Sequence, residues 1–378
     1  MSNTLTALVP TLFSAAQEVS AEPFGAVSAI NMSFDDKQVA KGDSVTVPVA
    51  PTRAASDFTP AATSTAGTDA IATSVAVQIT KSRKVSWNLT GEQIRTLENG
   101  NSNTHPEWVR QLVAQGMRTL RNEAEVDCCV AIKEGASRAV GTAGTTPFAT
   151  TLDALVDVRK VLVDNGAPMA DMQFVMNTSA GVNLRKLGIV QQADQAGSDA
   201  ERRTGQLLRQ FGFLLRESAG IATHTKGGGT SYVTSGSTAI GTQDIALVTG
   251  SGTVLVGDVV TFAADTNNKY VIKTGVAAAG TISLARPGAR VVIATSNAMT
   301  IGNSYTPNLA FERNAIVGIA RPPLMPDNPT MQKQLISDGS GLTYLLVQIA
   351  QYGMLTWELH LAWGFKVVQD EHVAIVMG

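Results

Sequence analysis

The chain of 378 residues contains only two cysteines, Cys128 and Cys129, and they are adjacent. Neighbouring cysteines do not form an ordinary structural disulfide, and they lack the C-x-x-C spacing of a metal site. We therefore expect two buried thiols in a reducing cytosol rather than a disulfide framework.

Charge of either sign is also scarce, because charged residues make up 16% of the chain and the formal net charge is −2. Tight binding to nucleic acid requires many Lys and Arg side chains that neutralise phosphates. The composition therefore predicts at most weak, non-specific contact with DNA.

No Lys or Arg precedes Lys37, so the start of the chain lacks the charged region of a signal peptide, and we expect no secretion. No apolar run approaches the ~20 residues that span a bilayer, so we expect no membrane association.

The common catalytic motifs are missing as well. The Walker A, dinucleotide-binding, nucleophile-elbow and zincin strings do not occur, and the four histidines are His105, His224, His360 and His372, without ligand spacing. We interpret His105 as a helix-cap residue and His360 as lying on the polar face of a strand. The run Gly227–Gly229 could cradle an anion, but no helix pattern follows it, so we interpret it as a flexible junction. The sequence therefore predicts no catalytic residue, no cofactor-binding residue and no metal ligand.

What the chain has is a series of distinct segments, long enough for two or three lobes and 44% hydrophobic. Residues 1–30 carry almost no charge and show no steady period, which is typical of an arm that packs on another surface. Two short β-rich pieces, 45–49 and 75–79, flank a long Ala/Thr/Ser-rich segment and predict a long hairpin. Because a two-stranded ribbon is marginal alone, we expect it to lie on its own chain or on a neighbour.

The strongest helix follows at 106–135, where Pro106 occupies a favoured first position and Glu107 complements the helix N-terminus. At 1.5 Å per residue this helix is roughly 45 Å long. The apolar residues at helical spacing are Trp108, Leu112, Val113, Met117, Leu120, Ala124 and Cys128. We expect them to form the buried face and the charged residues to occupy the other faces.

An α/β lobe is predicted next. A sequence like a capping box at 150–153 introduces a helix that Gly166 and Pro168 end. Further segments are a strand at 172–176, helices at 179–187 and 199–210, and a strand at 212–216. Residues 221–304 become rich in Gly, Thr and Val, and we predict an inserted small β-barrel with strands near 246, 259–263, 270–273, 281–284 and 290–294. After it we predict strands at 314–320, 355–363 (antiparallel and half-buried, from its alternating pattern) and 373–377.

This order of segments resembles the Hong Kong 97-type capsid fold of tailed phages and encapsulins. It is most similar to the coat proteins of short-tailed enterobacterial phages that carry an insertion domain. The strings that carry the resemblance are Asp57–Ala61, Val85–Thr90, Phe174–Asn177, Val256–Thr261, Asn308–Ala315 and Trp363–Val368. Their order supplies most of the specificity, since each string is short.

The resemblance implies an α+β fold with a fixed division of the chain. The implied parts are an N-arm with the start of a peripheral lobe (1–44), an extended hairpin loop (45–90), the peripheral lobe with its spine helix (91–149), an axial lobe (150–220 and 305–335), the inserted β-barrel (221–304), and a return to the peripheral lobe (336–378).

The implied function is that of a major capsid protein without enzymatic activity. It would assemble into hexamers and pentamers as a procapsid in the host bacterial cytoplasm and expand on maturation around packaged double-stranded DNA. Its implied partners are other copies of itself, a scaffolding protein and a portal protein, and the sequence leaves open whether a decoration protein also binds. Candidate inter-subunit contacts are Asp57, Phe58, Lys81, Arg83 and Lys84 in the hairpin region and Arg110, Arg118, Arg121, Glu123 and Glu125 on the long helix.

Three alternatives remain at this point. An encapsulin-like nanocompartment shares the shell fold, but the inserted barrel favours a virus. A tail-tube or decoration protein would lack the long helix, and an enzyme would need one of the missing motifs.

Two interpretations remain for the basic residues Lys81, Arg83 and Lys84. They contact phosphate or a neighbour's carboxylates, or they form an ordinary solvated strand end. Lys81 or Lys84 could also form a covalent crosslink with an Asn side chain of another subunit. That reaction requires an acidic residue, and the sequence does not reveal one.

Overall fold

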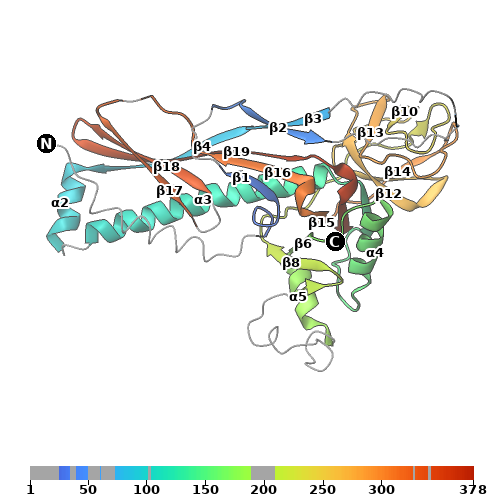
Figure 1. The fold of residues 1–378 in the computed structure, drawn as a ribbon, viewed down its shortest axis with the longest axis horizontal. Coiled ribbons are helices and arrows are strands. Elements are labelled where there is room, and N and C mark those ends of the chain that lie inside the picture. Colours follow the sequence, from blue (N-terminus) through green and yellow to red (C-terminus); the bar gives the residue numbers. More distant parts are fainter. Residues whose placement is uncertain are drawn as a thin grey trace.

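The computed structural model describes residues 25–34, 40–49, 60, 73–100, 104–188, 209–326, 328–338 and 342–378. Figure 1 shows an elongated molecule in which one long helix runs beside a sheet. An α/β lobe and a β-rich part lie where this helix ends, at the right of the view. Strands outnumber helices among these residues, and the predicted mixture of helices and strands is confirmed.

The long helix is α3, Thr104–Glu134, and it begins two residues before the predicted start at Pro106. Its buried apolar side chains include Val109, Val113, Met117, Leu120, Ala124, Cys128 and Ile132. The prediction that Trp108 lies on the buried face is wrong: Trp108 is 44% exposed, and Val109 takes the inward position. The two cysteines are free and buried as expected, and burial raises the pKa of both thiols.

Helix α3 packs against a six-stranded sheet centred on β19. The sheet contains β1 (Asn31–Phe34), β4 (Lys81–Thr90), β16 (Ile316–Arg321), β17 (Met331–Ser337), β18 (Thr343–Gln351) and β19 (Met354–Val367). Trp357, Leu359 and Trp363 of β19 belong to the core shared with α3, as their alternation predicts. The strand is antiparallel as predicted. The prediction that it is half-buried is wrong, because the hairpin packs on Ala362 and even the intervening His360 is only 6% exposed.

The predicted hairpin is confirmed for its two strands, β2 (Ser44–Val49) and β3 (Thr73–Gln78), which pair antiparallel. Its root lies on its own chain, where Val77 and Ile79 are buried with Ala362 of β19 and the Thr80 amide donates to the Trp363 carbonyl at 3.1 Å. Residues 50–59 and 61–72, with Asp57 and Phe58, lie outside the described residues.

The α/β lobe contains one sheet with the strand order β7-β8-β6-β15-β20-β5. Its elements are β5 (Arg138–Gly141), α4 (Asp153–Asp164), β6 (Met172–Asn177), α5 (Thr178–Lys186), β7 (Arg209–Gln210), β8 (Phe213–Ser218), β15 (Pro307–Glu312) and β20 (Val373–Met377). Phe148, Phe174 and Phe213 meet edge to face in its core, with ring centroids 5.9 Å apart.

Three local predictions in this region are wrong. The capping box expected between Thr150 and Asp153 is absent: the N-cap of α4 is Leu152, which makes no side-chain cap, and the Asp153 carboxylate accepts from the Thr151 hydroxyl. Of the helix predicted at 199–210, the described part, Arg209–Gln210, is strand β7, which pairs with β8; residues 199–208 lie outside the described residues. The strand predicted from Asn314 begins at Ile316, since the Glu312 carboxylate accepts from the Asn314 amide and holds a 3-10 turn there.

Residues 221–304, called the insert below, contain six strands. They are β9 (Val233–Thr234), β10 (Asp244–Val248), β11 (Val259–Phe262), β12 (Asp265–Thr274), β13 (Thr281–Leu284) and β14 (Met299–Ile301). Pairing runs β9-β10-β13-β12-β11-β14, and a bridge between Val233 and Ala298 returns to β9. β12 also pairs with β5, so these strands continue the sheet of the α/β lobe.

The strand predicted at 290–294 is absent from this described segment, which makes one isolated bridge between Thr238 and Ile293. The Arg290 amide donates to the Tyr270 hydroxyl at 2.9 Å, so its backbone bonds to a side chain instead of a neighbouring strand.

Candidate functional site

The predicted basic residues of β4 lie beside α3 and form ion pairs within the chain. The Lys81 ammonium lies 2.8 Å from an Asp127 carboxylate oxygen, and the Arg83 guanidinium lies 2.9 Å from that of Glu123. Lys84 pairs with Glu358 of β19 at 2.7 Å. These side chains therefore tie β4 to the long helix and the central strand. Because they are partly exposed, each pair contributes at most about 1 kcal/mol.

The five candidate residues of α3 lie in different surroundings. Arg110 pairs with Glu107 one turn away and lowers the pKa of that carboxyl group, while Arg118 is exposed and Glu123 is half-buried. Arg121 and Glu125 are only 2% and 4% exposed. The prediction that these two residues occupy charged outer faces is therefore wrong. Arg121 lies near Tyr344 of β18, and Glu125 faces the turn at residues 25–30 and the end of β8, so both charged groups are enclosed.

Glu125 fixes a segment far away in the sequence. Its two carboxylate oxygens accept hydrogen bonds from the Ala26 amide at 2.7 Å and the Val27 amide at 3.0 Å. The Ser218 hydroxyl donates to the same carboxylate at 2.6 Å. A buried carboxylate is tolerated because these donors replace water. Glu125 thereby joins α3 to the turn at residues 25–30 and to the end of β8.

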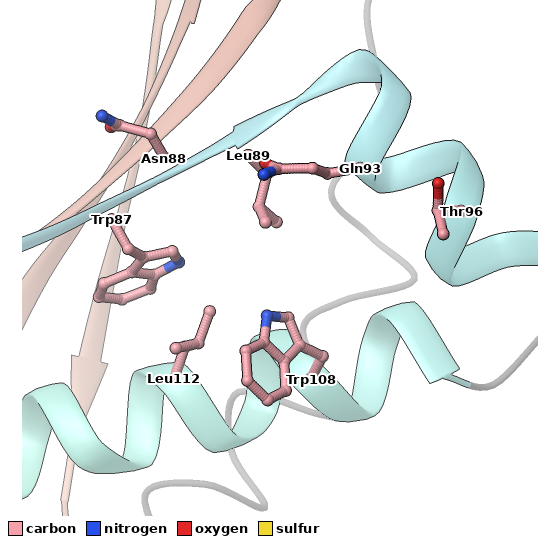
Figure 2. Close-up of a pocket in the computed structure, with 7 residues that line it drawn as sticks. All are labelled: Trp87, Asn88, Leu89, Gln93, Thr96, Trp108 and Leu112. Atoms are coloured by element: carbon pink, nitrogen blue, oxygen red, sulfur yellow. The ribbon is translucent and has the colours of Figure 1, made fainter.

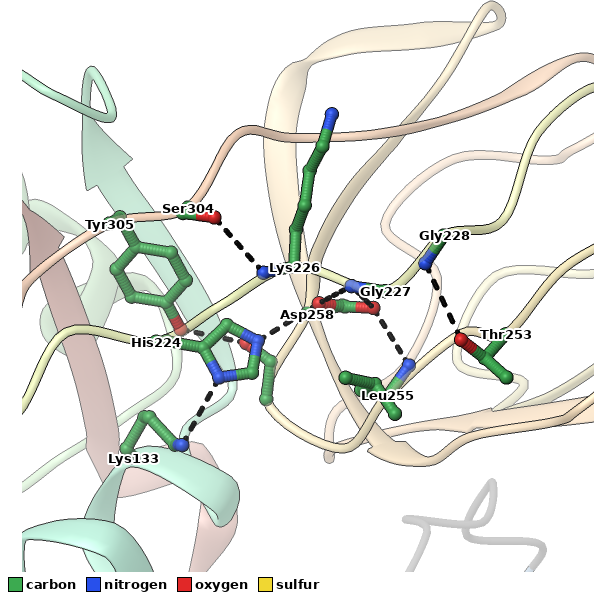
Figure 3. Close-up of polar contacts among 11 residues, drawn as sticks. Lys133, His224, Lys226, Gly227, Gly228, Thr253, Leu255, Asp258, Ser304 and Tyr305 are labelled. Carbon is green, nitrogen blue, oxygen red and sulfur yellow. Dashed lines mark hydrogen bonds and ion pairs between the residues drawn. The ribbon is translucent and has the colours of Figure 1, made fainter.

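A second buried polar group lies where the insert leaves and rejoins the rest of the chain (Figure 3). We call Lys133, His224, Asp258 and Tyr305 the root cluster. The backbones of His224 and Tyr305 hydrogen-bond to each other in both directions, so the entering and returning segments lie side by side. The Tyr305 hydroxyl donates to the Gly257 carbonyl at 2.7 Å, which joins both segments to the turn before β11.

Asp258 is the centre of the root cluster and is fully buried. Its carboxylate accepts from the Leu255 amide at 2.7 Å and from the Gly227 amide, which lies 3.1 Å from both oxygens. His224 Nε2 lies 2.9 Å from Oδ1, and His224 Nδ1 lies 3.2 Å from the Lys133 ammonium at the end of α3. An ammonium group can only donate, so Nδ1 accepts and Nε2–H donates to Asp258. Burial lowers the pKa of Lys133, whereas the charges of Glu134 and Asp258 oppose that shift.

The glycine run at 227–229 lies beside the root cluster, at the junction where the insert begins. The Gly229 amide donates to the Thr253 carbonyl, and a Cβ atom at Gly227 would lie 2.3 Å from that same carbonyl oxygen. The run is therefore packed tightly against the 253–258 segment. Its backbone amide does bind an anion, but that anion is the carboxylate of Asp258 in the same chain.

Sequence reasoning missed the root cluster because its members are up to 172 positions apart, from Lys133 to Tyr305. The only local signal was the Val256–Thr261 string that carried part of the resemblance. Among the described residues no group of three His, Cys, Asp or Glu side chains could hold a metal ion. No helix in the described ranges is long and apolar enough to cross a membrane.

No protein-family model and no curated protein matches this chain. Among solved structures, the capsid of cyanophage P-SCSP1u matches 92% of this chain and 86% of its own, with a TM-score of 0.50 and 12% identity. The chain has the fold of a phage capsid protein. The predicted capsid fold is thereby confirmed at this level.

Two further structures align over most of the chain with lower scores. The mature capsid of bacteriophage PhiM1 gives a TM-score of 0.48 at 11% identity and covers 93% of this chain and 86% of its own. A virus-like particle from Pyrococcus furiosus gives 0.42 at 9% identity and covers 97% and 98%. The assignment of the fold rests on the cyanophage capsid, whose score is higher.

Proposed function

We propose that this protein is the major capsid subunit of a tailed phage with double-stranded DNA, built on the Hong Kong 97-type fold. The observation that carries the proposal is the fold shared with the cyanophage capsid over 92% of the chain. The role is structural, without catalysis. Subunits would form hexamers and pentamers that close into an icosahedral shell.

The shape of the described chain supports assembly. The β2–β3 hairpin packs its valines against β16 and β19, while the other face of β2 has exposed side chains at alternate positions along the whole strand. A two-stranded ribbon of this kind gains most from a second surface, which a neighbouring subunit would supply. Many weak contacts in a closed lattice add to a stable shell.

The contact residues on this proposal are the exposed and partly exposed candidates. Lys81, Arg83, Lys84, Arg110, Arg118 and Glu123 would exchange or extend their ion pairs with a neighbour, and Asp57 and Phe58 would contribute from the hairpin. The insert would act as a small β-barrel domain that touches neighbouring capsomers, as in the short-tailed enterobacterial phages. A scaffolding protein, a portal protein and a decoration protein are the proposed partners, and packaged DNA would make weak contacts.

The test is negative-stain electron microscopy and sedimentation of the protein expressed alone and with the neighbouring genes of its operon. Closed shells or rings of five and six subunits, filled with DNA when the operon is present, are the expected result. A stable monomer under both conditions would refute the shell function. Shells that enclose protein cargo and never DNA would support an encapsulin-like compartment instead.

A charge reversal separates a contact residue from a merely exposed one. Arg118→Glu should reduce the yield of shells by more than its effect on the melting temperature of the subunit accounts for, because Arg118 is exposed on α3. Lys186→Glu, an equally exposed position outside the candidate set, is the matched control. Equal effects of both variants would remove Arg118 from the proposed interface.

A further inference from the structure

An apolar cavity opens between β4, α2 (Gly91–Gly100) and the first turns of α3, and we call it the Trp cavity (Figure 2). Its volume is about 490 Å³. The lining residues are Trp87, Asn88, Leu89, Gln93, Thr96, Trp108 and Leu112. The exposed Trp108, which the helical pattern had placed in the core, forms one wall. A large aromatic side chain left in water at the mouth of an apolar hollow is typical of a binding site.

The Trp cavity also contains a hydrogen-bond donor that lacks an acceptor. The Trp87 indole nitrogen is buried and has no hydrogen-bond partner among the described residues. Figure 2 shows the indole nitrogens of Trp87 and Trp108 both turned towards the open space. An unsatisfied buried donor costs roughly 1–3 kcal/mol. The occupant that fits therefore supplies apolar side chains together with an acceptor, as the carbonyl groups of a peptide backbone do.

The first 24 residues of the chain have this chemistry. They contain Leu5, Val9, Leu12 and Phe13, and their only charged side chains are Glu18 and Glu22. The segment joins the described fold at Gly25, directly before the two amides that bind Glu125 of α3. The point of attachment and the Trp cavity therefore lie along the same helix.

The distances agree with docking in the same subunit. Glu125 and Trp108 are separated by 17 residues of helix, which corresponds to about 26 Å. The 12 residues from Phe13 to Gly25 extend to at most about 40 Å, so Phe13 and Leu12 can reach the cavity with slack. The exposed Arg118 lies between the two points and is opposite in charge to Glu18 and Glu22.

We propose that residues 5–13 occupy the Trp cavity of their own subunit, with Leu12 and Phe13 against the two indole rings and a backbone carbonyl accepting from Trp87. This intramolecular docking does not depend on shell formation, so it can fail while the proposed capsid function stands, and the reverse also holds.

A disulfide crosslink in the full-length protein tests the geometry. In the variant Leu12→Cys with Thr96→Cys, mild oxidation of the dilute protein should link the two positions in most chains at the mass of a monomer. The native Cys128 and Cys129 are buried and do not compete. The matched control is Leu12→Cys with Thr281→Cys, which places the second thiol at an exposed position of the insert. No link, a link only at the mass of a dimer, or equal linking in the control would overturn the proposal.

Tryptophan fluorescence gives a second, independent readout, because only Trp87 and Trp108 of the four tryptophans line the cavity. Phe13→Asp should shift the emission to longer wavelength and raise iodide quenching at least twofold, while Phe13→Leu should behave like the unsubstituted protein. Ser14→Asp controls for the added charge. Unchanged emission and quenching in Phe13→Asp, with an unchanged melting temperature, would refute docking of the arm.

Discussion

The Nε2 atom of His224 lies 2.9 Å from the Asp258 Oδ1 atom, and neither side chain is more than 7% exposed. His224 belongs to the segment that enters the insert, and Asp258 belongs to the turn before β11. Through Lys133, the same imidazole reaches the end of the long helix. The buried carboxylate and the donors around it therefore help to fix the insert relative to α3, beside the pairing of β12 with β5.

Asp258→Asn should destabilise the protein by roughly 3–5 kcal/mol, because one carboxylate oxygen is replaced by an amide that faces backbone donors. Urea denaturation followed by circular dichroism measures the loss. Asp244→Asn is the control, since its carboxylate is exposed and accepts a hydrogen bond from the Ser283 hydroxyl at the surface. Similar losses in the two variants would show that Asp258 has no special role.

The sequence predicted the long helix and the hairpin strands well because their signals are local. A 3.6-residue period and a proline at the start are sufficient for a helix, and alternating valines are sufficient for a strand. Which residues of the helix face the core was harder to predict. Trp108 and Val109 are both apolar, and only the packing of β4 and β19 decides which of them is buried.

The candidate site was less predictable, since the sequence does not show which charged residues are buried. Glu123 and Glu125 look alike in the sequence, yet one pairs at the surface with Arg83 and the other is enclosed by the turn at residues 25–30. The root cluster depends on segments that meet only in the folded chain. Local patterns therefore reveal elements, whereas the partners of a buried carboxylate require the tertiary structure.

Glu125→Gln should therefore cost roughly 2–3 kcal/mol, because an amide nitrogen cannot accept from the Ala26 or Val27 amide. Hydrogen exchange at these two amides should accelerate at least tenfold, which separates local release of the turn from global unfolding. Glu123→Gln, two residues away, is the matched control and should cost less than about 1 kcal/mol. Protected Ala26 and Val27 amides in Glu125→Gln would contradict the anchoring role.

Gly364→Ala should detach the root of the hairpin from β19. A Cβ atom at Gly364 would lie 1.9 Å from the Gln78 carbonyl oxygen, so the backbone of the hairpin must move. We expect a loss of roughly 1–3 kcal/mol and faster proteolysis within β2 and β3. Gly91→Ala is the control, because a Cβ atom there meets nothing within 4 Å, and it should be neutral or slightly stabilising. Resistance of the hairpin to protease in Gly364→Ala would show that the close approach is not required.

The stability of the sheet should fall in mild acid because of His360. Burial lowers the pKa of His360 from 6.5, although the Glu358 carboxylate and its hydrogen bond oppose the shift, and the Lys84 charge adds to it. The unfolded chain then binds a proton below pH ~6.5 that the folded chain does not bind. Stability is therefore full above this pH and falls as the pH decreases towards the lower folded value, by at most about 1.4 kcal/mol per pH unit.

Urea denaturation between pH 5 and 7 measures this slope, and His360→Gln should flatten it. The window lies above the titration of Glu358, whose pKa is raised by burial but lowered overall by hydrogen bonds from Lys84 and His360. Stability linked to Glu358 is present above pH ~4.5 and is lost only as the pH falls further, so the two residues are separable. An identical slope in the variant would assign the acid sensitivity to another group, and a slope of opposite sign would mean that His360 is charged in the folded sheet.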